Sequence, residues 1–266
     1  MSDLLIVVIG VVAGVTTVLF GFGGGFVAVP VIIWADAPLG GAAPTVAVAT
    51  SSVVMVINAA IATAATPAAV LAWLRRSAPL LALLAAGGGV GALLARLAPP
   101  AVIGWGYIVY LVAAITDVLL RPGFIRPASA PTETAGTFAI PAALGVPIGA
   151  TASFLGVGGS IMTVPLLRRA GFGMRTAASL ANPLTLAISL PACLVFLLTS
   201  HPAGAHDAGL AGAVDFRAAA LLLAGAIPVV VALRRRPPRL PDRVHARGYV
   251  TLLVVVLAAM LLSQTA

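Results

Sequence analysis

Long apolar stretches follow one another along the whole chain and are separated by short polar loops. A helix needs about 20 apolar residues to cross a bilayer. Six stretches meet this length and predict transmembrane helices, and they cover residues 44–73, 79–98, 101–120, 176–199, 213–233 and 247–263. Two more, of about 30 residues, cover 4–34 and 137–167. The pattern leaves no room for a soluble domain and predicts an all-α polytopic membrane protein.

Glycine interrupts the two longest stretches near their middle. Residues 21–25 read GFGGG, residues 156–160 read GVGGS, and a Val-Pro pair follows each cluster. Glycine weakens a helix and proline kinks one. Each stretch therefore predicts either one long tilted helix or two half-helices of about 15 residues that form a re-entrant hairpin.

The two interrupted stretches resemble each other. Residues 14–33 align without gaps with residues 149–168, and the glycines and the Val-Pro pair fall in the same register. Many transporters are built from two such repeats. The sequence predicts a first repeat over residues 1–126 and a second over residues 127–266, each with one broken pair and three spans. Further along, a small gap places Thr50 opposite Asn182.

Composition and charge support a membrane protein. Hydrophobic residues make up 61% of the chain and charged residues 8%, and the mean hydropathy is +1.14. All 15 cationic residues are arginine, and the net charge is +8. The positive-inside rule explains this charge better than a nucleic-acid partner does, so no nucleic acid is expected.

The same rule distinguishes the two topologies. If both broken stretches are re-entrant, 13 arginines lie on one side and only Arg96 and Arg217 on the other, whereas eight full spans give a 10 to 5 split. We therefore predict six spans, two re-entrant segments, inverted repeats and both termini outside. The first apolar run lacks a basic n-region and is expected to belong to the mature protein.

The glycine clusters are the candidate binding site. A broken helix is tolerated at membrane depth only where it is buried in protein or lines a wet cavity. The second half-helix of each pair exposes free N–H groups and a positive dipole end, and two such ends near the midplane predict an anion site. The candidate substrate-binding residues are Gly21, Gly23, Gly24, Gly25, Gly156, Gly158, Gly159 and Ser160, with Thr50, Ser51 and Asn182 on the following helices.

Close helix packing is the alternative role for glycine. Small residues four positions apart let helices approach closely. We favour packing for the pairs Gly10 and Gly14, Gly87 and Gly91, and Gly145 and Gly149. For the two aligned clusters we favour the site, since packing does not require three consecutive small residues followed by proline.

The doubled Gly-x-Gly-Gly-(Gly/Ser) element with its Val-Pro pair resembles the TauE/SafE sulfite-exporter family, and the resemblance covers essentially the whole chain. It implies an inner-membrane permease for small sulfur-containing anions such as sulfite, thiosulfate or organosulfonates. By this resemblance, residues 21–25 and 156–160 are the motif positions. Ser160 replaces the third glycine of the second copy and could give a hydroxyl to the ligand.

Charged residues and the single cysteine reduce the number of possible functions. Asp117 is the one charge within a span and is expected to pair with Arg121 four residues later, with proton transfer as the alternative. The chain has no phosphate-binding loop and no lysine, so ATP hydrolysis is not expected. Cys193 stands alone and predicts neither a disulfide nor a metal centre. No cofactor and no metal is expected.

Several functional alternatives stay open. The leading hypothesis is a secondary transporter of a small anion, and the second is an anion channel with the same glycine site. A membrane scaffold is a third. An intramembrane serine protease based on Ser160 would need a nearby base, and His201, His206 and His245 are all expected in loops. The coupling ion, the transport direction and a homo-oligomeric state are left open.

Overall fold

The computed structural model describes residues 2–74, 77–125, 140–198 and 210–265, and every regular element in these ranges is a helix. The first part of the chain forms α1 (Asp3–Phe20), α2 (Gly25–Ala35), α3 (Ala43–Ala64), α4 (Ala68–Leu71), α5 (Ala78–Leu97) and α6 (Pro100–Leu120). The second part forms α7 (Gly145–Leu155), α8 (Ser160–Arg169), α9 (Met174–Leu197), α10 (Phe216–Arg235) and α11 (Asp242–Thr265). Short 3₁₀ turns over Ala37–Ala42, Ala72–Leu74 and Ala142–Leu144 accompany α3, α4 and α7.

Seven of the described helices are long and apolar enough to cross a membrane, judged by length and composition: α1, α3, α5, α6, α9, α10 and α11. The predicted class, an all-helical multi-pass membrane protein, is therefore confirmed. Several helices differ in length from expectation: α2 and α7 have 11 residues and α8 has 10, which is shorter than a half-helix of about 15. α1 has 18 residues, more than a half-helix of about 15, and α3 ends at Ala64 because Pro67 disfavours helix in the residue before it.

Part of the predicted topology falls outside the described residues. This applies to the expected start of the second broken stretch at residues 137–139 and to the last residue of the span 176–199. It also applies to Arg75, Arg76 and Arg126 among the arginines used for the positive-inside count.

Glycine brings α1 against α10. A Cβ atom on Gly10 would overlap the Leu222 carbonyl oxygen, and one on Gly14 would lie 2.6 Å from the Ala226 carbonyl oxygen. The later glycine of α1 meets the later residue of α10, so the two helices run parallel. The backbones meet where side chains are smallest, as close packing in a membrane requires.

The helices α5 and α7 repeat this arrangement. Cβ atoms on Gly87 and Gly91 would overlap the carbonyl oxygens of Val146 and Ala150, and one on Gly149 would overlap that of Leu84. These two helices also run parallel. The packing role predicted for the small-residue pairs is confirmed in both helix pairs.

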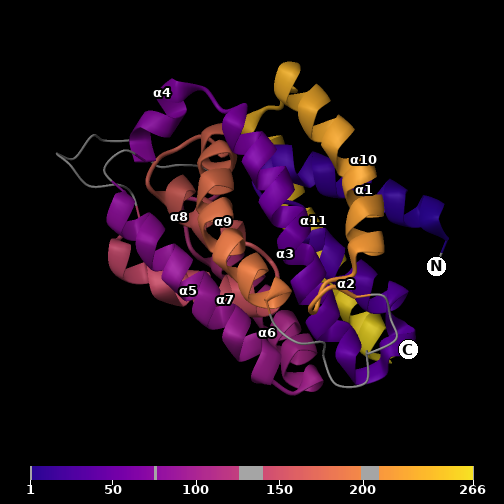
Figure 1. Cartoon of the computed structure of the whole chain (residues 1–266). Helices are drawn as coiled ribbons and strands as arrows, with labels where there is room; N and C mark the ends of the chain where they lie inside the picture. Colours follow the sequence, from indigo (N-terminus) through magenta and orange to yellow (C-terminus); the bar gives the residue numbers. More distant parts are fainter. Residues whose placement is uncertain (1, 75–76, 126–139, 199–209, 266) are drawn as a thin grey trace.

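The helices α3 and α9 form the centre of the bundle. They lie side by side, with α1 and α10 on one flank and α5 and α7 on the other (Figure 1). Val48 packs in one cluster with Phe196, whereas Ala65 lines the same cavity as Ser179. The early part of α3 therefore meets the late part of α9, and the two helices are antiparallel.

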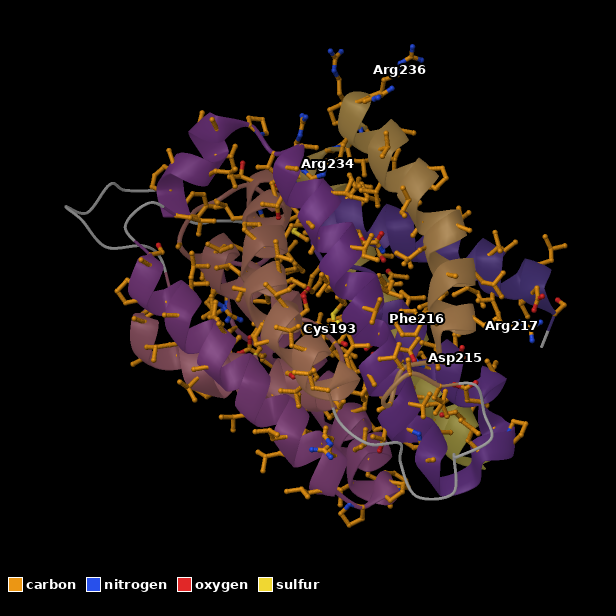
Figure 2. The ribbon with its side chains drawn as sticks, viewed as in Figure 1. Cys193, Asp215, Phe216, Arg217, Arg234 and Arg236 are labelled. Carbon is orange, nitrogen blue, oxygen red and sulfur yellow. The ribbon has the colours of Figure 1, made fainter. Side chains whose placement is uncertain are left out.

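The ends of α10 define two faces of the bundle. Arg234 and Arg236 lie at its C-terminal end, and Asp215, Phe216 and Arg217 at its N-terminal end (Figure 2). We call the first the arginine-rich face and the second the opposite face. Each end of the α1–α2 pair has a neighbour on the opposite face. Asp3 forms an ion pair with Arg217 at 2.9 Å, and Asp36, after α2, lies beside Asp215.

The α7–α8 pair has both ends on the arginine-rich face, because Arg168 of α8 forms an ion pair with Asp242 at the start of α11 and His245, in the same turn of α11, lines a cavity with Arg234. Gly145 at the start of α7 packs on Leu80 and Leu84 near the start of α5. Arg169 at the end of α8 forms an ion pair with Asp117 near the end of α6 at 2.6 Å. Only residues 98–99 join α5 to α6, so the start of α5 and the end of α6 lie on one side of the bundle.

Candidate functional site

Both broken segments change direction at the glycines. α1 ends in Gly21 and α2 begins at Gly25, while α7 ends in Gly156 and α8 begins at Ser160. Gly21, Gly23, Gly24, Gly156 and Gly158 have φ values between 65° and 86°. Residues with a Cβ rarely adopt this left-handed conformation, so these five positions of the turns require glycine.

The two breaks touch each other in the middle of the bundle. A Cβ on Gly158 would lie 3.3 Å from the Phe22 carbonyl oxygen, and one on Gly25 would lie 3.0 Å from the Gly156 carbonyl oxygen. Ser51 of α3 donates a hydrogen bond to the Gly156 carbonyl (3.1 Å), and Thr185 of α9 donates one to the Gly21 carbonyl (3.4 Å). Each central helix thus holds the break of the other half of the chain.

Free backbone amides gather at this meeting point. The first residues of a helix have no intrahelical acceptor for their N–H groups. Neither α2 nor α8 has a side-chain cap, and among the described residues nothing accepts from the N–H groups of Gly25, Phe26, Ser160 or Ile161. Two positive helix ends therefore meet in the core, where an anion would be stabilised.

Buried side chains without partners surround the breaks. Within the described part of the chain, neither amide atom of Asn58 has a hydrogen-bond partner, and the same holds for Asn182 Oδ1 and Ser160 Oγ. All three side chains are fully buried. Leaving such a group unpaired costs about 1–3 kcal/mol, so a polar ligand at the breaks would relieve this cost.

The predicted site residues do not all meet. The glycines, Ser160 and Ser51 lie at the contact between the breaks, and Asn182 lies on α9 one turn from Thr185. Thr50 instead faces the start of α10, where its hydroxyl accepts a hydrogen bond from the Asp215 N–H at 2.9 Å. Thr50 therefore supports the first turn of α10 and not the breaks.

The contacts also correct the sequence register of α3 against α9. Met55 and Thr185 each lie beside both Gly23 and Gly158. Asn58 lies beside Gly24, and Ile188 lies beside its counterpart Gly159. This register places Asn182 opposite Ser52, two positions beyond the Thr50 that the sequence alignment indicated. The gap in the sequence alignment was therefore two residues too short.

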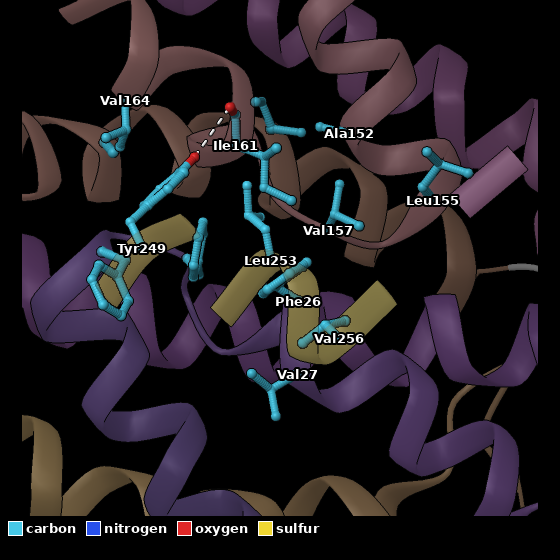
Figure 3. Close-up of a cluster of buried hydrophobic side chains, with 14 of the residues drawn as sticks. Phe26, Val27, Ala152, Leu155, Val157, Ile161, Val164, Tyr249, Leu253 and Val256 are labelled. Carbon is cyan, nitrogen blue, oxygen red and sulfur yellow. Dashed lines mark hydrogen bonds between the residues drawn. The ribbon is translucent and has the colours of Figure 1, made fainter. Parts of the chain in front are cut away.

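Two tyrosines that sequence reasoning missed hold the helices after the breaks. Tyr107 of α6 donates to the Phe26 carbonyl at 2.7 Å, and Tyr249 of α11 donates to the Ile161 carbonyl at 3.2 Å. Figure 3 shows Tyr249 among buried apolar side chains with its hydroxyl directed at this segment. Phe26 and Ile161 are counterparts in the repeat alignment, so the two hydroxyls make matching contacts.

A sequence signal for these tyrosines exists. The last long helix of each half contains Gly-Tyr-x-x-x-Leu-Val, at residues 106–112 and 248–254. The alignment of residues 14–33 with residues 149–168 does not reach this element, which explains why it was missed.

Removing either hydroxyl should weaken the site. We expect Tyr107→Phe and Tyr249→Phe each to lower the free energy of unfolding by about 1 kcal/mol, because each leaves a buried carbonyl without its donor. Thermal unfolding in detergent measures the effect. Tyr110→Phe is the matched control, since the Tyr110 hydroxyl is buried without a partner among the described residues. Equal losses in all three variants would contradict the proposed role of the hydrogen bonds.

Asp117 takes the structural role that the sequence favoured. Its carboxylate forms an ion pair with Arg121 at 3.2 Å and a second with Arg169 at 2.6 Å. The i,i+4 pairing is confirmed, and Arg169 is an additional partner from α8.

His245 corrects an expectation. It was predicted in a loop but lies in the first turn of α11, is buried, and hydrogen-bonds the Leu19 carbonyl through Nε2. Ser160 Oγ has no hydrogen-bond partner in the described ranges, so it forms no Ser–His pair with this histidine. The other two, His201 and His206, lie outside the described residues.

Asp36, which follows α2, lies beside a second carboxylate, that of Asp215. The pKa of Asp36 is raised to about 7, first by burial and then by the charge of Asp215 and a hydrogen bond with it. At the opposite face of the bundle, burial and the neighbouring carboxylate thus favour the protonated form of Asp36.

Comparison with known proteins supports a transport role. The family model described as "Sulfite exporter TauE/SafE" matches residues 6–260, which is nearly the whole chain. No curated protein and no solved structure gave a match.

Proposed function

The chain belongs to the TauE/SafE family of sulfite exporters, and from this membership we propose that it is a secondary transporter of a small sulfur-containing anion in a bacterial inner membrane. Sulfite, thiosulfate and small organosulfonates are the candidate substrates. The observation that supports this most is the meeting of two uncapped helix starts, α2 and α8, in the buried centre of the bundle.

We propose further that the two halves are inverted repeats. In this scheme α1, α2, α3, α5 and α6 correspond to α7, α8, α9, α10 and α11. Exchanging the halves turns the α1–α10 contact into the α7–α5 contact and leaves the α3–α9 and α6–α11 contacts unchanged. The α1–α2 pair has both ends near the start of α10, whereas α7 begins near the start of α5 and α8 ends near the end of α6. This supports two re-entrant segments that enter from opposite sides.

The arrangement fits an anion better than a cation or a neutral solute. The free N–H groups of Gly25, Phe26, Ser160 and Ile161 are donors, and the adjacent carbonyls of Gly21, Phe26, Gly156 and Ile161 are already hydrogen-bonded by Thr185, Tyr107, Ser51 and Tyr249. Four N–H donors at the breaks are therefore free, while four of the nearby carbonyls already accept a hydrogen bond from a side chain. Donors together with two positive helix ends select negative charge.

The same architecture is compatible with alternating access. Ser51, Asn58, Ser160 and Asn182 are all fully buried, so the breaks are closed to solvent from both faces in this conformation. Movement of one half against the other around the breaks would open the site to each face in turn. In this scheme the termini lie outside and the arginine-rich face lies in the cytoplasm, in line with the positive-inside rule.

Sulfite flux into proteoliposomes tests the proposal. We expect Ser160→Ala to weaken sulfite affinity by about tenfold, because a hydrogen bond to a charged group contributes about 1.5–3 kcal/mol. Ser77→Ala is the matched control. Its hydroxyl is also buried and without a partner among the described residues, but it lies at the start of α5.

A second variant separates binding from folding. Asn58→Leu removes a buried amide without partners, so the folded protein should be at least as stable while sulfite affinity falls by tenfold or more. Wild-type proteoliposomes that move no sulfur oxyanion would refute the transport proposal. Equal kinetics for Ser160→Ala and Ser77→Ala would refute the assignment of the site to the breaks.

The anion channel is the second candidate, since the same donors could form a filter. Saturable flux with exchange of labelled substrate across the bilayer is the result expected of the transporter. Single-channel currents would favour the channel.

A further inference from the structure

A cavity of ≈ 350 Å³ lies at the arginine-rich face beside the first broken segment. Five helices meet there: the ends of α1, α3 and α10 and the starts of α9 and α11. We call it the arginine vestibule and define it by the side chains that carry the argument: Leu19, Arg175, Ser179, Arg234, Arg239 and His245.

The charges of the vestibule are unbalanced. Arg175, Arg234 and Arg239 line it, and no aspartate or glutamate is among its described lining residues. Arg175 is close enough to Arg234 for their like charges to repel. Two guanidinium groups that line one cavity without a carboxylate would be stabilised by an anion bound between them.

Arg234 gives an independent indication of a ligand. Its Nη1 donates to Ser179 Oγ at 3.3 Å, but its Nε and Nη2 are buried and have no acceptor among the described residues. A guanidinium offers a planar fork of donors that matches two oxygens of an oxyanion. The unpaired Nε and Nη2 form one edge of such a fork.

The vestibule adjoins the break. Leu19 lines it and lies two residues before Gly21, and His245 from the opposite wall hydrogen-bonds the Leu19 carbonyl. One turn further along α11, Tyr249 holds the carbonyl of Ile161. The rings of Phe20, Phe22 and Tyr249 pack together next to these two hydrogen bonds, with centroids 5.1–5.8 Å apart.

We propose that the arginine vestibule is a second binding site for a small oxyanion, from which the solute passes the ring layer of Phe20, Phe22 and Tyr249 to reach the breaks. This inference rests on the transport function proposed above. The guanidinium pair recognises the charged oxygens of a sulfur oxyanion or those of a phosphate, and we assign the site to the free anion rather than to a lipid headgroup.

Binding of labelled sulfate to the purified chain in uncharged detergent, at low ionic strength, tests the vestibule. We expect two classes of site in the wild type. Arg234→Gln should weaken one class by tenfold or more, and Arg236→Gln should leave both within twofold. Arg236 is the matched control because it lies at the same end of α10, carries the same charge and is exposed.

Stability distinguishes a binding role from a structural one. Arg234→Gln should not lower the unfolding temperature in sulfate-free buffer, because it removes a half-buried positive charge that lies near Arg175 and forms no ion pair among the described residues. If Arg234→Gln does lower the unfolding temperature, Arg175→Gln becomes the test variant. The Arg175 side chain is exposed, so its replacement should leave the fold intact and weaken the same class of sulfate site. Unchanged sulfate binding in a folded Arg175→Gln variant would overturn the proposal.

Nanodiscs separate the two sources of the anion. Sulfate binding should be the same in discs of phosphatidylcholine alone and in discs that also contain phosphatidylglycerol. Loss of one class of site only in the anionic discs would overturn the assignment to a free anion. If the wild type transports sulfite but Arg234→Gln and Arg236→Gln bind sulfate equally well, the vestibule proposal alone is refuted. If the wild type transports no sulfite, the transport function is refuted.

Discussion

Replacing Arg168 by methionine is expected to lower the free energy of unfolding by about 3–5 kcal/mol. Arg168 lies at the end of α8 and is 0% exposed. Its Nε and Nη2 donate to the Phe124 carbonyl at 2.8 and 2.6 Å, and its Nη1 donates to the Phe172 carbonyl at 3.2 Å. Nη1 also forms an ion pair with Asp242 at 2.8 Å. Methionine fills a similar volume but leaves these acceptors without a donor.

The effect should be large because Arg168 joins segments far apart in the sequence. Asp242 at the start of α11 accepts from Arg168 and from the Met174 N–H at the start of α9. The loss of one side chain therefore loosens three helices at once. Chemical or thermal unfolding in detergent measures the change. Arg236→Met serves as the control because its side chain is exposed, and a loss as large as that of Arg168→Met would contradict the explanation.

Gly91→Ala should separate α5 from α7. The added Cβ would overlap the Ala150 carbonyl oxygen and lie 2.9 Å from the Ala150 carbonyl carbon and Cα. Backbone cannot move away as the tip of a side chain can, so we expect a loss of roughly 3 kcal/mol in unfolding free energy. Gly225→Ala should act similarly on the α10–α1 pair, where a Cβ would overlap the Val7 carbonyl oxygen.

Gly89→Ala is the matched control for Gly91→Ala. It lies two residues away on the same helix, and a Cβ there meets no atom within 4 Å. Alanine is the better helix former by roughly 1 kcal/mol, so this variant should be slightly more stable than the wild type. A loss in Gly89→Ala equal to that in Gly91→Ala would mean that the close contact between α5 and α7 is not the cause.

The sequence predicted the features that depend on local composition. Stretches such as 79–98 and 101–120 are too apolar and too long for a soluble protein, and α5 and α6 follow them closely. The interruptions at the two glycine clusters were predictable because glycine weakens a helix and the following proline kinks one. The spacing of Gly87 and Gly91 likewise indicated a close helix contact before any partner was known.

Contacts between distant segments were not predictable in this way. Thr50 and Ser51 are neighbours on one helix, yet Ser51 faces a break and Thr50 faces Asp215. In a membrane helix the residues that face lipid and those that face protein are both apolar, so the pattern along α3 does not reveal which side packs inward. The register of α3 against α9 therefore had to come from the structure.

What the sequence by itself determined is the class of protein, its family resemblance, the two interrupted helices and the glycines on which close packing depends, because each of these follows from the properties of short stretches of chain. Only the tertiary structure decided that Tyr107 and Tyr249 hold the two breaks, that Arg168 is buried, that Asp36 lies beside Asp215 and that Arg175 and Arg234 share a cavity. The physical reason is that these pairings join residues from separate helices, and a buried hydrogen bond or charge acquires its partner only when the helices pack.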